Sequence, residues 1–204
     1  SPHQMGIGYP VADSLIEERI EECETNASAC ETSHPDPLTN GTYYYNTSLT
    51  GDLDINTSEG DVVLVVNGSF TPGTVNVSGS RNVTVFINGD FAFGGIDTIN
   101  YGGDAVAFTA IVHSSGDVDM NGAFRYVGFV YAPGSDVDLN GGGPPWFVNV
   151  RGGIVGKTID INGHPNKFEY DDSISDIQID TETGLSTITY LHVSSTTINV
   201  TGPR

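Results

Sequence analysis

Basic residues are scarce in this chain. Lysine occurs twice and arginine five times against 26 acidic residues, so the formal net charge of the 204 residues is −19. Proteins that bind nucleic acid need a basic face that displaces counterions from phosphates, so this charge argues against that class of function. No run reaches the roughly 18 apolar residues needed to cross a bilayer, and the segment from Ser1 to Tyr9 is too polar for a signal peptide. We therefore expect membrane contact only through an N-terminal anchor that this sequence lacks.

The acidic residues are spread along the whole chain and do not form a tail. Their mutual repulsion destabilises a compact state unless salt screens it, and at molar salt the Debye length is only about 3 Å. The pattern predicts a halophilic origin. The alternative is an ordinary acidic secreted protein.

Cysteine is also rare. Cys23 and Cys30 are the only two, and their spacing predicts one small disulfide loop formed in an oxidising compartment. Eight Asn-x-Ser/Thr sequons favour a glycosylated extracellular protein, although single sequons arise by chance in a chain rich in these residues. The candidate glycosylation sites are Asn26, Asn40, Asn46, Asn56, Asn67, Asn76, Asn82 and Asn199.

Helical periodicity is confined to residues 11–24. Ser14 and Glu17 have the spacing of a capping box, and one apolar stripe follows at helical spacing: Leu15, Ile16, Ile20 and Cys23. We expect this stripe to pack on the rest of the domain. The alternative is that it continues an upstream membrane helix. Residues 1–41 are predicted to be this helix and a linker. Residues 42–174 are predicted to form a β-solenoid and residues 175–204 a C-terminal cap, and the three parts are expected to form one compact domain.

A short repeat dominates the β-domain. Asp117-Val-Asp-Met-Asn-Gly122, Asp136-Val-Asp-Leu-Asn-Gly141 and Thr158-Ile-Asp-Ile-Asn-Gly163 follow one another at similar intervals. Upstream, Asn67-Gly68 and Asn88-Gly89 are separated by nearly the same interval. A short, regular period in strand-and-turn units predicts stacked rungs, with Asn and Gly supplying left-handed corners. We expect a mainly β fold, a parallel β-solenoid resembling a right-handed β-helix. An antiparallel sandwich with Asn-Gly hairpins is the alternative.

Residues 175–200 break this repeat. The segment from Ile177 to Val193 predicts a hairpin that turns near Glu182 to Gly184, and a last strand is expected from Thr196 to Val200. Terminal units of a solenoid must cover its open end, so we expect these residues to form the C-terminal cap.

Aligning the rungs stacks aspartates in columns. Asp119, Asp138 and Asp160 form one column, and Asp117 and Asp136 form a second. Carboxylates one strand apart repel by about 1 kcal/mol even in water, so salt, a bound cation or outward splay should offset the repulsion. The Asp-x-Asp-x-Asn-Gly order matches half of an EF-hand loop, but Gly128 and Phe147 stand where its bidentate Glu belongs. These five aspartates are therefore either a looser calcium or monovalent-cation site or solvated rung corners. No other cofactor is indicated.

Parallel β-helices also host polysaccharide lyases and hydrolases, which need a carboxylate pair, or calcium with a basic residue. Arg125 and Arg151 are the basic residues that could lie near the aspartate columns. The alternative is that they are surface ion-pair partners. His113 and His164 are too far apart in the repeat to suggest a dyad, so we assign no catalytic residues.

The segment Gly152-Gly-Ile-Val-Gly-Lys-Thr-Ile-Asp-Ile-Asn-Gly163, followed by Phe168-Glu-Tyr-Asp-Asp172, resembles the C-terminal rungs of pilin-like, type IV pilus-assembly-associated surface proteins of haloarchaea and bacteria. Thr189 to Val193 also resembles the haloarchaeal version. The resemblance implies a β-helical ectodomain behind a hydrophobic pilin-type helix, which this sequence lacks, and it implies no catalytic residues.

Together these patterns predict a non-enzymatic structural or adhesive protein of the cell surface, associated with a pilus. Its expected partners are other surface or pilus proteins, or glycans. The alternative is a carbohydrate-binding or carbohydrate-cleaving β-helix.

Overall fold

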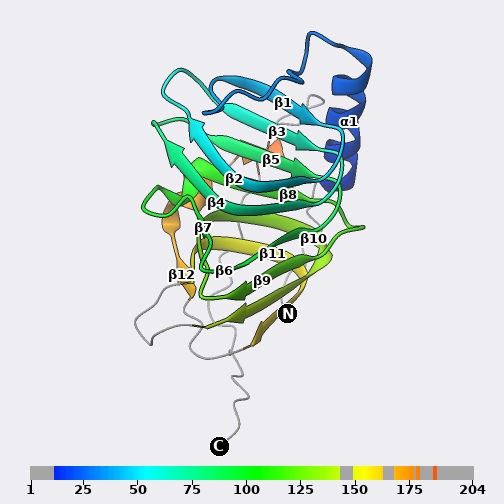
Figure 1. Cartoon of the computed structure of the whole chain (residues 1–204). Coiled ribbons are helices and arrows are strands. Elements are labelled where there is room, and N and C mark those ends of the chain that lie inside the picture. Colours follow the sequence, from blue (N-terminus) through cyan, green and yellow to red (C-terminus); the bar gives the residue numbers. More distant parts are fainter. Residues whose placement is uncertain (1–11, 143–148, 163–167, 177, 180–185, 188–204) are drawn as a thin grey trace, which may run out of the picture.

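The computed structural model describes residues 12–142, 149–162, 168–176, 178–179 and 186–187 (Figure 1). One helix, α1, spans Ala12–Thr25, and two short 3-10 helices, η1 and η2, span Ala105–Ala107 and Asp172–Asp176. The strands are β1 (Gly41–Tyr45), β2 (Leu49–Asn56), β3 (Val62–Val66), β4 (Phe70–Ser78), β5 (Val83–Ile87), β6 (Phe91–Gly95), β7 (Thr98–Ile99), β8 (Phe108–Val112), β9 (Val118–Gly122), β10 (Arg125–Gly141), β11 (Val150–Asn162), β12 (Phe168–Tyr170), β13 (Gln178–Ile179) and β14 (Ser186–Thr187).

The strands β1 to β12 stack in parallel as a β-solenoid of about five turns, which confirms the predicted fold class. Register partners along one ladder are Tyr43, Leu64, Val85, Ala110 and Val130, and the turn from Val85 to Ala110 is the longest of the four that they delimit. All pairings in this sheet are parallel, which excludes the antiparallel sandwich for the described residues.

Each turn contributes to three ladders, which we call the first, second and third faces. The first face contains β1, β3, β5, β8 and the central parts of β10 and β11. The second contains the beginnings of β2 and β4, then β6, β9 and the ends of β10 and β11. The third contains the ends of β2 and β4, then β7, the beginnings of β10 and β11, and β12.

The Asn-Gly pairs occupy two different places in the turn, so aligning all of them on one repeat was wrong. Asn67-Gly68 and Asn88-Gly89 follow strands of the first face. Asn121, Asn140 and Asn162 lie in register at the end of the second face. The two corners use glycine for different reasons. Gly122 has the predicted left-handed backbone, with φ +86°, whereas Gly68 and Gly89 do not. A Cβ at Gly68 would lie 2.6 Å from the Ser48 nitrogen of the preceding turn, so there glycine allows the turns to approach closely.

Apolar side chains line the inside of the solenoid. The aromatic rings of Phe70 and Phe91, in consecutive turns, stack 5.6 Å apart, and Tyr126 meets Phe91 edge to face at 6.2 Å. The Tyr126 hydroxyl donates to the carbonyl of Phe129 at 3.0 Å, so the buried phenol keeps a hydrogen-bond partner. Burial raises the pKa of Tyr126 well above its ordinary value.

The helix α1 covers the outside of the first face, which confirms both the predicted helix and its packing stripe (Figure 1). Its buried side chains are Ala12, Leu15, Ile16, Ile20 and Cys23. They share a cluster with outward-pointing residues of four successive turns: Tyr44, Val65, Phe86 and Ile111. No helix among the described residues is long and apolar enough to cross a membrane.

Part of the segment predicted as a linker begins the stack. Glu31 forms a parallel bridge with Tyr43, and Leu38 forms one with Ile55. Leu38 is buried, and His34 stacks on the ring of Tyr45 at 3.8 Å. This loop therefore closes the N-terminal end of the solenoid.

Toward the C-terminus of the chain, β13 and β14 pair antiparallel, Gln178 with Thr187 and Ile179 with Ser186, which agrees with the predicted hairpin. Its turn and the strand expected from Thr196 to Val200 lie outside the described residues. Capping by residues 175–204 stays a prediction.

Candidate functional site on the second face

Three aspartates stack in register on the second face. Asp138 of β10 pairs with Asp119 of β9 on one side and with Asp160 of β11 on the other. Because side chains alternate along a strand and the neighbours Val137 and Leu139 are buried, the aspartates point outward. The predicted column is therefore formed. Its three aspartates lie within strands, however, and not at the bends between them, so the interpretation of these residues as rung corners was wrong.

The second column is formed at a corner and starts earlier than the repeat indicated. The backbone N–H of Asp117 donates to Oδ1 of Asp90 at 3.1 Å. The same contact recurs upstream, where Ser69 Oγ accepts from the N–H of Asp90 at 3.2 Å and Ser48 Oγ from that of Ser69 at 3.1 Å. The equal spacing of Ser48, Ser69 and Asp90 along the chain was the available sequence signal for this column.

Asp136 is held by residues of the following turn. Its Oδ1 accepts a hydrogen bond from Thr158 Oγ1 at 2.7 Å and lies 3.7 Å from Nζ of Lys157. Both side chains of this ion pair are more than half exposed, so the pair contributes little to stability.

The electrostatic effect of stacking is visible at Asp119. Partial burial raises the pKa of Asp119, and the carboxylates of Asp138, Asp117 and Asp90 raise it further. All three neighbouring charges that shift this pKa are negative. The column is thus a site of unrelieved like-charge repulsion, which a protonated carboxyl, dissolved salt or a bound cation would relieve.

Among the described residues, no group of three or more His, Cys, Asp or Glu side chains is placed to hold a metal ion. The cation site expected at Asp117, Asp119, Asp136, Asp138 and Asp160 stays a prediction.

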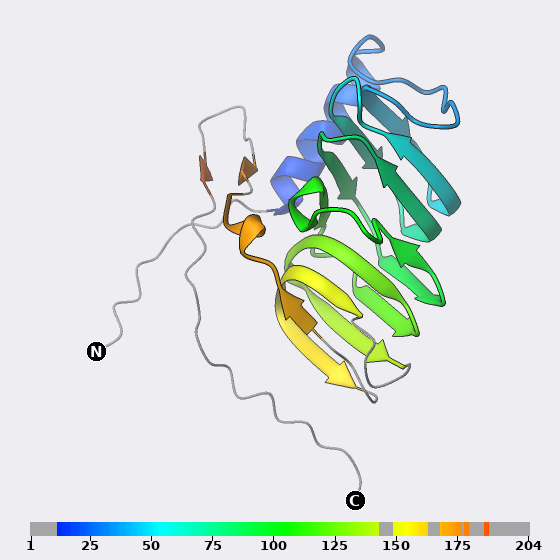
Figure 2. The same cartoon turned by 90° about the vertical axis from the view of Figure 1, so that its left-hand side faces the viewer.

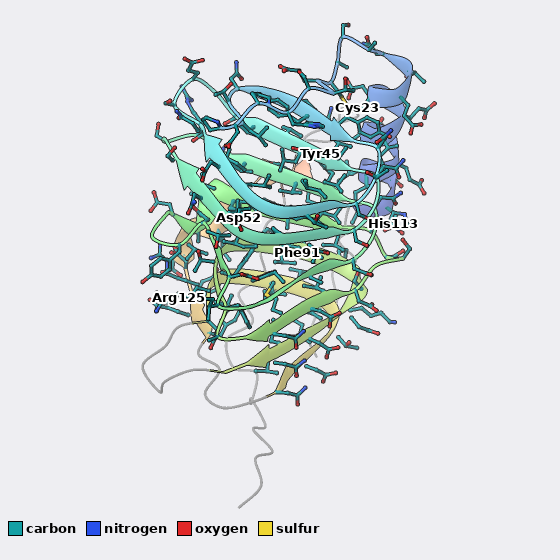
Figure 3. The ribbon with its side chains drawn as sticks, in the orientation of Figure 1. Cys23, Tyr45, Asp52, Phe91, His113 and Arg125 are labelled. Carbon is teal, nitrogen blue, oxygen red and sulfur yellow. A yellow bond between two sulfur atoms is a disulfide. The ribbon has the colours of Figure 1, made fainter. Side chains whose placement is uncertain are left out.

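The two arginines considered for catalysis have other neighbours. Arg125 begins β10 on the third face, and its guanidinium carbon lies 4.4 Å from the centre of the Tyr101 ring (Figure 3). Arg151 lies on the same face, where Nη2 donates to the carbonyl of Gly103 at 2.8 Å and Nε is 3.2 Å from the carboxylate of Asp171. Two hydrogen bonds from Ser173 lower the pKa of Asp171, and Arg151 lowers it further.

A polar latch between α1 and the corner after β8 was missed by sequence reasoning. Asp13 accepts hydrogen bonds from the backbone N–H of Ser114, at 2.7 Å, and from its hydroxyl. Nε2 of His113 lies 3.6 Å from Glu17 (Figure 3). Burial raises the pKa of Asp13, but the Ser114 hydrogen bonds and His113 outweigh it, so the net shift is downward. His164 lies outside the described residues.

The predicted disulfide is confirmed. Cys23 at the end of α1 and Cys30 in the following loop are bonded, with Cα atoms 5.2 Å apart. The bond fastens α1 to the loop that closes the N-terminal end of the solenoid. No free cysteine remains.

The candidate glycosylation sites differ in how their amides are used. Nδ2 of Asn67 donates to the Tyr44 hydroxyl at 3.3 Å and to Glu24 at 3.4 Å, while its Oδ1 accepts from Asn88 at 2.9 Å. Nδ2 of Asn76 donates to Asp54 at 2.8 Å. Asn26, Asn40, Asn46 and Asn82 are exposed, Asn56 is half-buried, and Asn199 lies outside the described residues.

The sequence model of a domain of unknown function, DUF7305, matches residues 2–177. The chain belongs to the DUF7305 family. In this chain the matched residues include α1 and the strands β1 to β12. No curated protein and no solved structure gives a significant match to the chain.

Proposed function

We propose that this DUF7305 protein is a non-enzymatic structural or adhesive protein of the cell surface, in which the solenoid serves as a rigid support for a polar outer face. The observation that carries the proposal is the in-register stacking of Asp119, Asp138 and Asp160 beside Asn121, Asn140 and Asn162. A solvent-facing array that repeats over three consecutive strands, β9 to β11, suits contact with an extended partner, because the same groups recur along its length.

An oxidising, extracellular location is supported by the disulfide between Cys23 and Cys30. A halophilic origin is supported by the net charge of −19 and by the raised pKa of Asp119, since both describe repulsion that salt would screen. An archaeal origin rests on the sequence resemblance. Association with a pilus rests on the sequence resemblance, and α1 would then link the solenoid to a preceding anchor.

The test is localisation on intact cells of the source organism. Protease added outside the cells should remove the protein, while a cytosolic marker survives, and a strain lacking the gene should lose attachment or pili. Protection of the protein until the cells are lysed would refute the surface assignment. Wild-type attachment and piliation in the deletion strain would refute the structural and adhesive role.

Carbohydrate binding is a second candidate function, favoured by an exposed aromatic residue. Tyr101 is 62% exposed in the loop after β7, and the guanidinium of Arg125 lies against its ring. Exposed aromatic rings provide flat apolar surfaces on which sugar rings can stack, and arginine binds acidic groups of a polysaccharide. Tyr101→Ala should weaken retention on immobilised acidic polysaccharide, whereas Tyr101→Phe should preserve it. Equal retention of both variants would exclude this site.

Carbohydrate cleavage would instead use Asp119 and Asp138, because these two carboxyls lie in register on neighbouring strands and the raised pKa of Asp119 suits a general acid. Asp138→Ala would then abolish the release of reducing ends from a susceptible polysaccharide while leaving the melting temperature near that of the wild type. Cleavage by the wild type that this substitution eliminates would overturn the non-enzymatic proposal.

A further inference from the structure

The last turn of the solenoid leaves inward-facing side chains uncovered among the described residues. Val137 and Leu139 of β10 are 1% and 3% exposed, whereas their register partners Ile159 and Ile161 of β11 are 43% and 37% exposed. Of the described strands, only β10 and β12 pair with β11, and β12 reaches only its beginning. Figure 2 shows β11 and β12 at the end of the stack opposite β1. The end of β11 therefore presents both an apolar strip and a strand edge.

The opposite end of the solenoid is already paired on its first and third faces. There the loop containing Leu38 already pairs with the first turn, and the bond between Cys23 and Cys30 fastens that loop to α1. A head-to-tail contact between two copies would have to fit around this loop. A segment of the same chain meets no such obstacle and is therefore the better candidate for the occupant.

The C-terminal sequence of this chain repeats the pattern of the uncovered strand. Ile198-Asn-Val-Thr-Gly202 has the order apolar, amide, apolar, polar, glycine. The strands of the second face read Val118-Asp-Met-Asn-Gly122 and Val137-Asp-Leu-Asn-Gly141, and β11 ends in Ile159-Asp-Ile-Asn with Gly163 following. The separation of Ile159 and Ile198 along the chain is close to twice the repeat length. About one repeat length is taken up by the part of the chain that leaves the stack at η2, and the other would bring Ile198 back to the position that follows Ile159.

The charge of this segment also fits the end of the aspartate column. Residues 183–204 contain no acidic residue, although the chain as a whole has 26. At the position of the aspartates the segment carries Asn199. An asparagine stacked on an aspartate already occurs in this solenoid, where Nδ2 of Asn76 donates to Asp54, its register partner, at 2.8 Å. An amide at this place ends the repulsive column with a hydrogen bond.

We propose that residues 196–202 form the next strand of the second face and pair in parallel with the end of β11. Ile198 covers Ile159, Val200 covers Ile161, and Asn199 lies beside Asp160. The C-terminal segment thereby completes the solenoid and closes the strand edge through which two molecules would otherwise associate. This inference identifies which residues cap the solenoid and in which register, and it is independent of the proposed function.

Cysteine pairing tests the register. In Asp160→Cys with Asn199→Cys, mild oxidation should give an intrachain disulfide in most molecules, with a yield independent of protein concentration, because in-register Cα atoms lie about 5 Å apart. The matched control, Asp160→Cys with Thr201→Cys, shifts the partner two positions along the strand and should give a several-fold lower yield. A disulfide that joins two chains would show that a second copy covers the end. That result, or equal yields from both pairs, overturns the proposal.

A second measurement keeps the proposal testable if the cysteine variants fold poorly. Ile198→Asp places a charge against Ile159 and should expose the apolar strip, which raises the fluorescence of a hydrophobic dye several-fold and speeds amide hydrogen exchange at Ile161. Thr197→Asp makes the same change in charge at an outward position and should leave both signals unchanged. Equal responses of the two variants would contradict the proposed register.

Discussion

Removing the central charge of the aspartate column should stabilise the protein at low salt. Asp138 has a carboxylate neighbour in register on each side, Asp119 and Asp160. At a strand spacing of about 4.8 Å, each pair of charges repels by about 0.9 kcal/mol in water. Outward splay and screening reduce the sum of the two, so Asp138→Asn should gain about 1 kcal/mol at about 0.1 M KCl. For a chain of this size that gain raises Tm by about 2 to 4 °C.

The salt dependence distinguishes repulsion from a bound cation. At about 2 M KCl the Debye length falls below the strand spacing, so the gain of Asp138→Asn should largely disappear, while wild-type Tm rises. Asp54→Asn is the matched control, because it removes one charge on the same sheet where the register partner is Asn76. It should give no gain. Thermal melts in both salts, with and without calcium, provide the measurement. A lower Tm of Asp138→Asn at low salt, or a calcium-dependent rise that only the wild type shows, would refute the repulsion argument.

Four further predictions concern the latch, the core, the disulfide and the titration of the column. Asp13→Asn should lower the Tm at neutral pH, because it removes the charged carboxylate that accepts the Ser114 hydrogen bonds. The stabilisation by this carboxylate is lost as pH falls through the lowered pKa of Asp13, so the Tm difference between the variant and the wild type should vanish in acid. Phe91→Ala removes a ring from the interior stack and should cost about 3 to 5 kcal/mol in chemical denaturation; a loss below about 1 kcal/mol would show that this core is not tightly packed. Reduction of Cys23 and Cys30 should destabilise the chain by about 2.5 kcal/mol through loop entropy, with a lower Tm in reducing buffer as the check. The pKa of Asp119 is raised in the folded chain, so this group stabilises the fold below its unfolded pKa, and the stabilisation is lost as pH rises through its folded pKa. The chemical shift of its carboxyl carbon should therefore titrate above the ordinary aspartate range. A midpoint at the ordinary aspartate value would contradict the stacking.

The sequence by itself determined the local structure of this protein. The apolar stripe from Leu15 to Cys23 fixed the helix, because a period near 3.6 buries one side only. The repeated Asp-x-Asn-Gly order determined parallel stacking and the in-register column through Asp138, because identical rungs bury their apolar residues only when equivalent positions align. The disulfide was equally local, since the short segment between Cys23 and Cys30 limits how far the two can separate.

Only the tertiary structure decided which repeats share a corner and what covers each surface. Asn67-Gly68 and Asn121-Gly122 look alike in sequence, yet they lie at different corners and need glycine for different reasons. Gly122 has a left-handed backbone, whereas Gly68 leaves room for the backbone of Ser48 in the preceding turn. The contact of Asp13 with Ser114 joins residues 101 positions apart, and no local pattern encodes such a distance. The exposure of Ile159, whose equivalents are buried in every earlier turn, likewise depends on which turn comes last, because burial in a solenoid is supplied by the neighbouring rung.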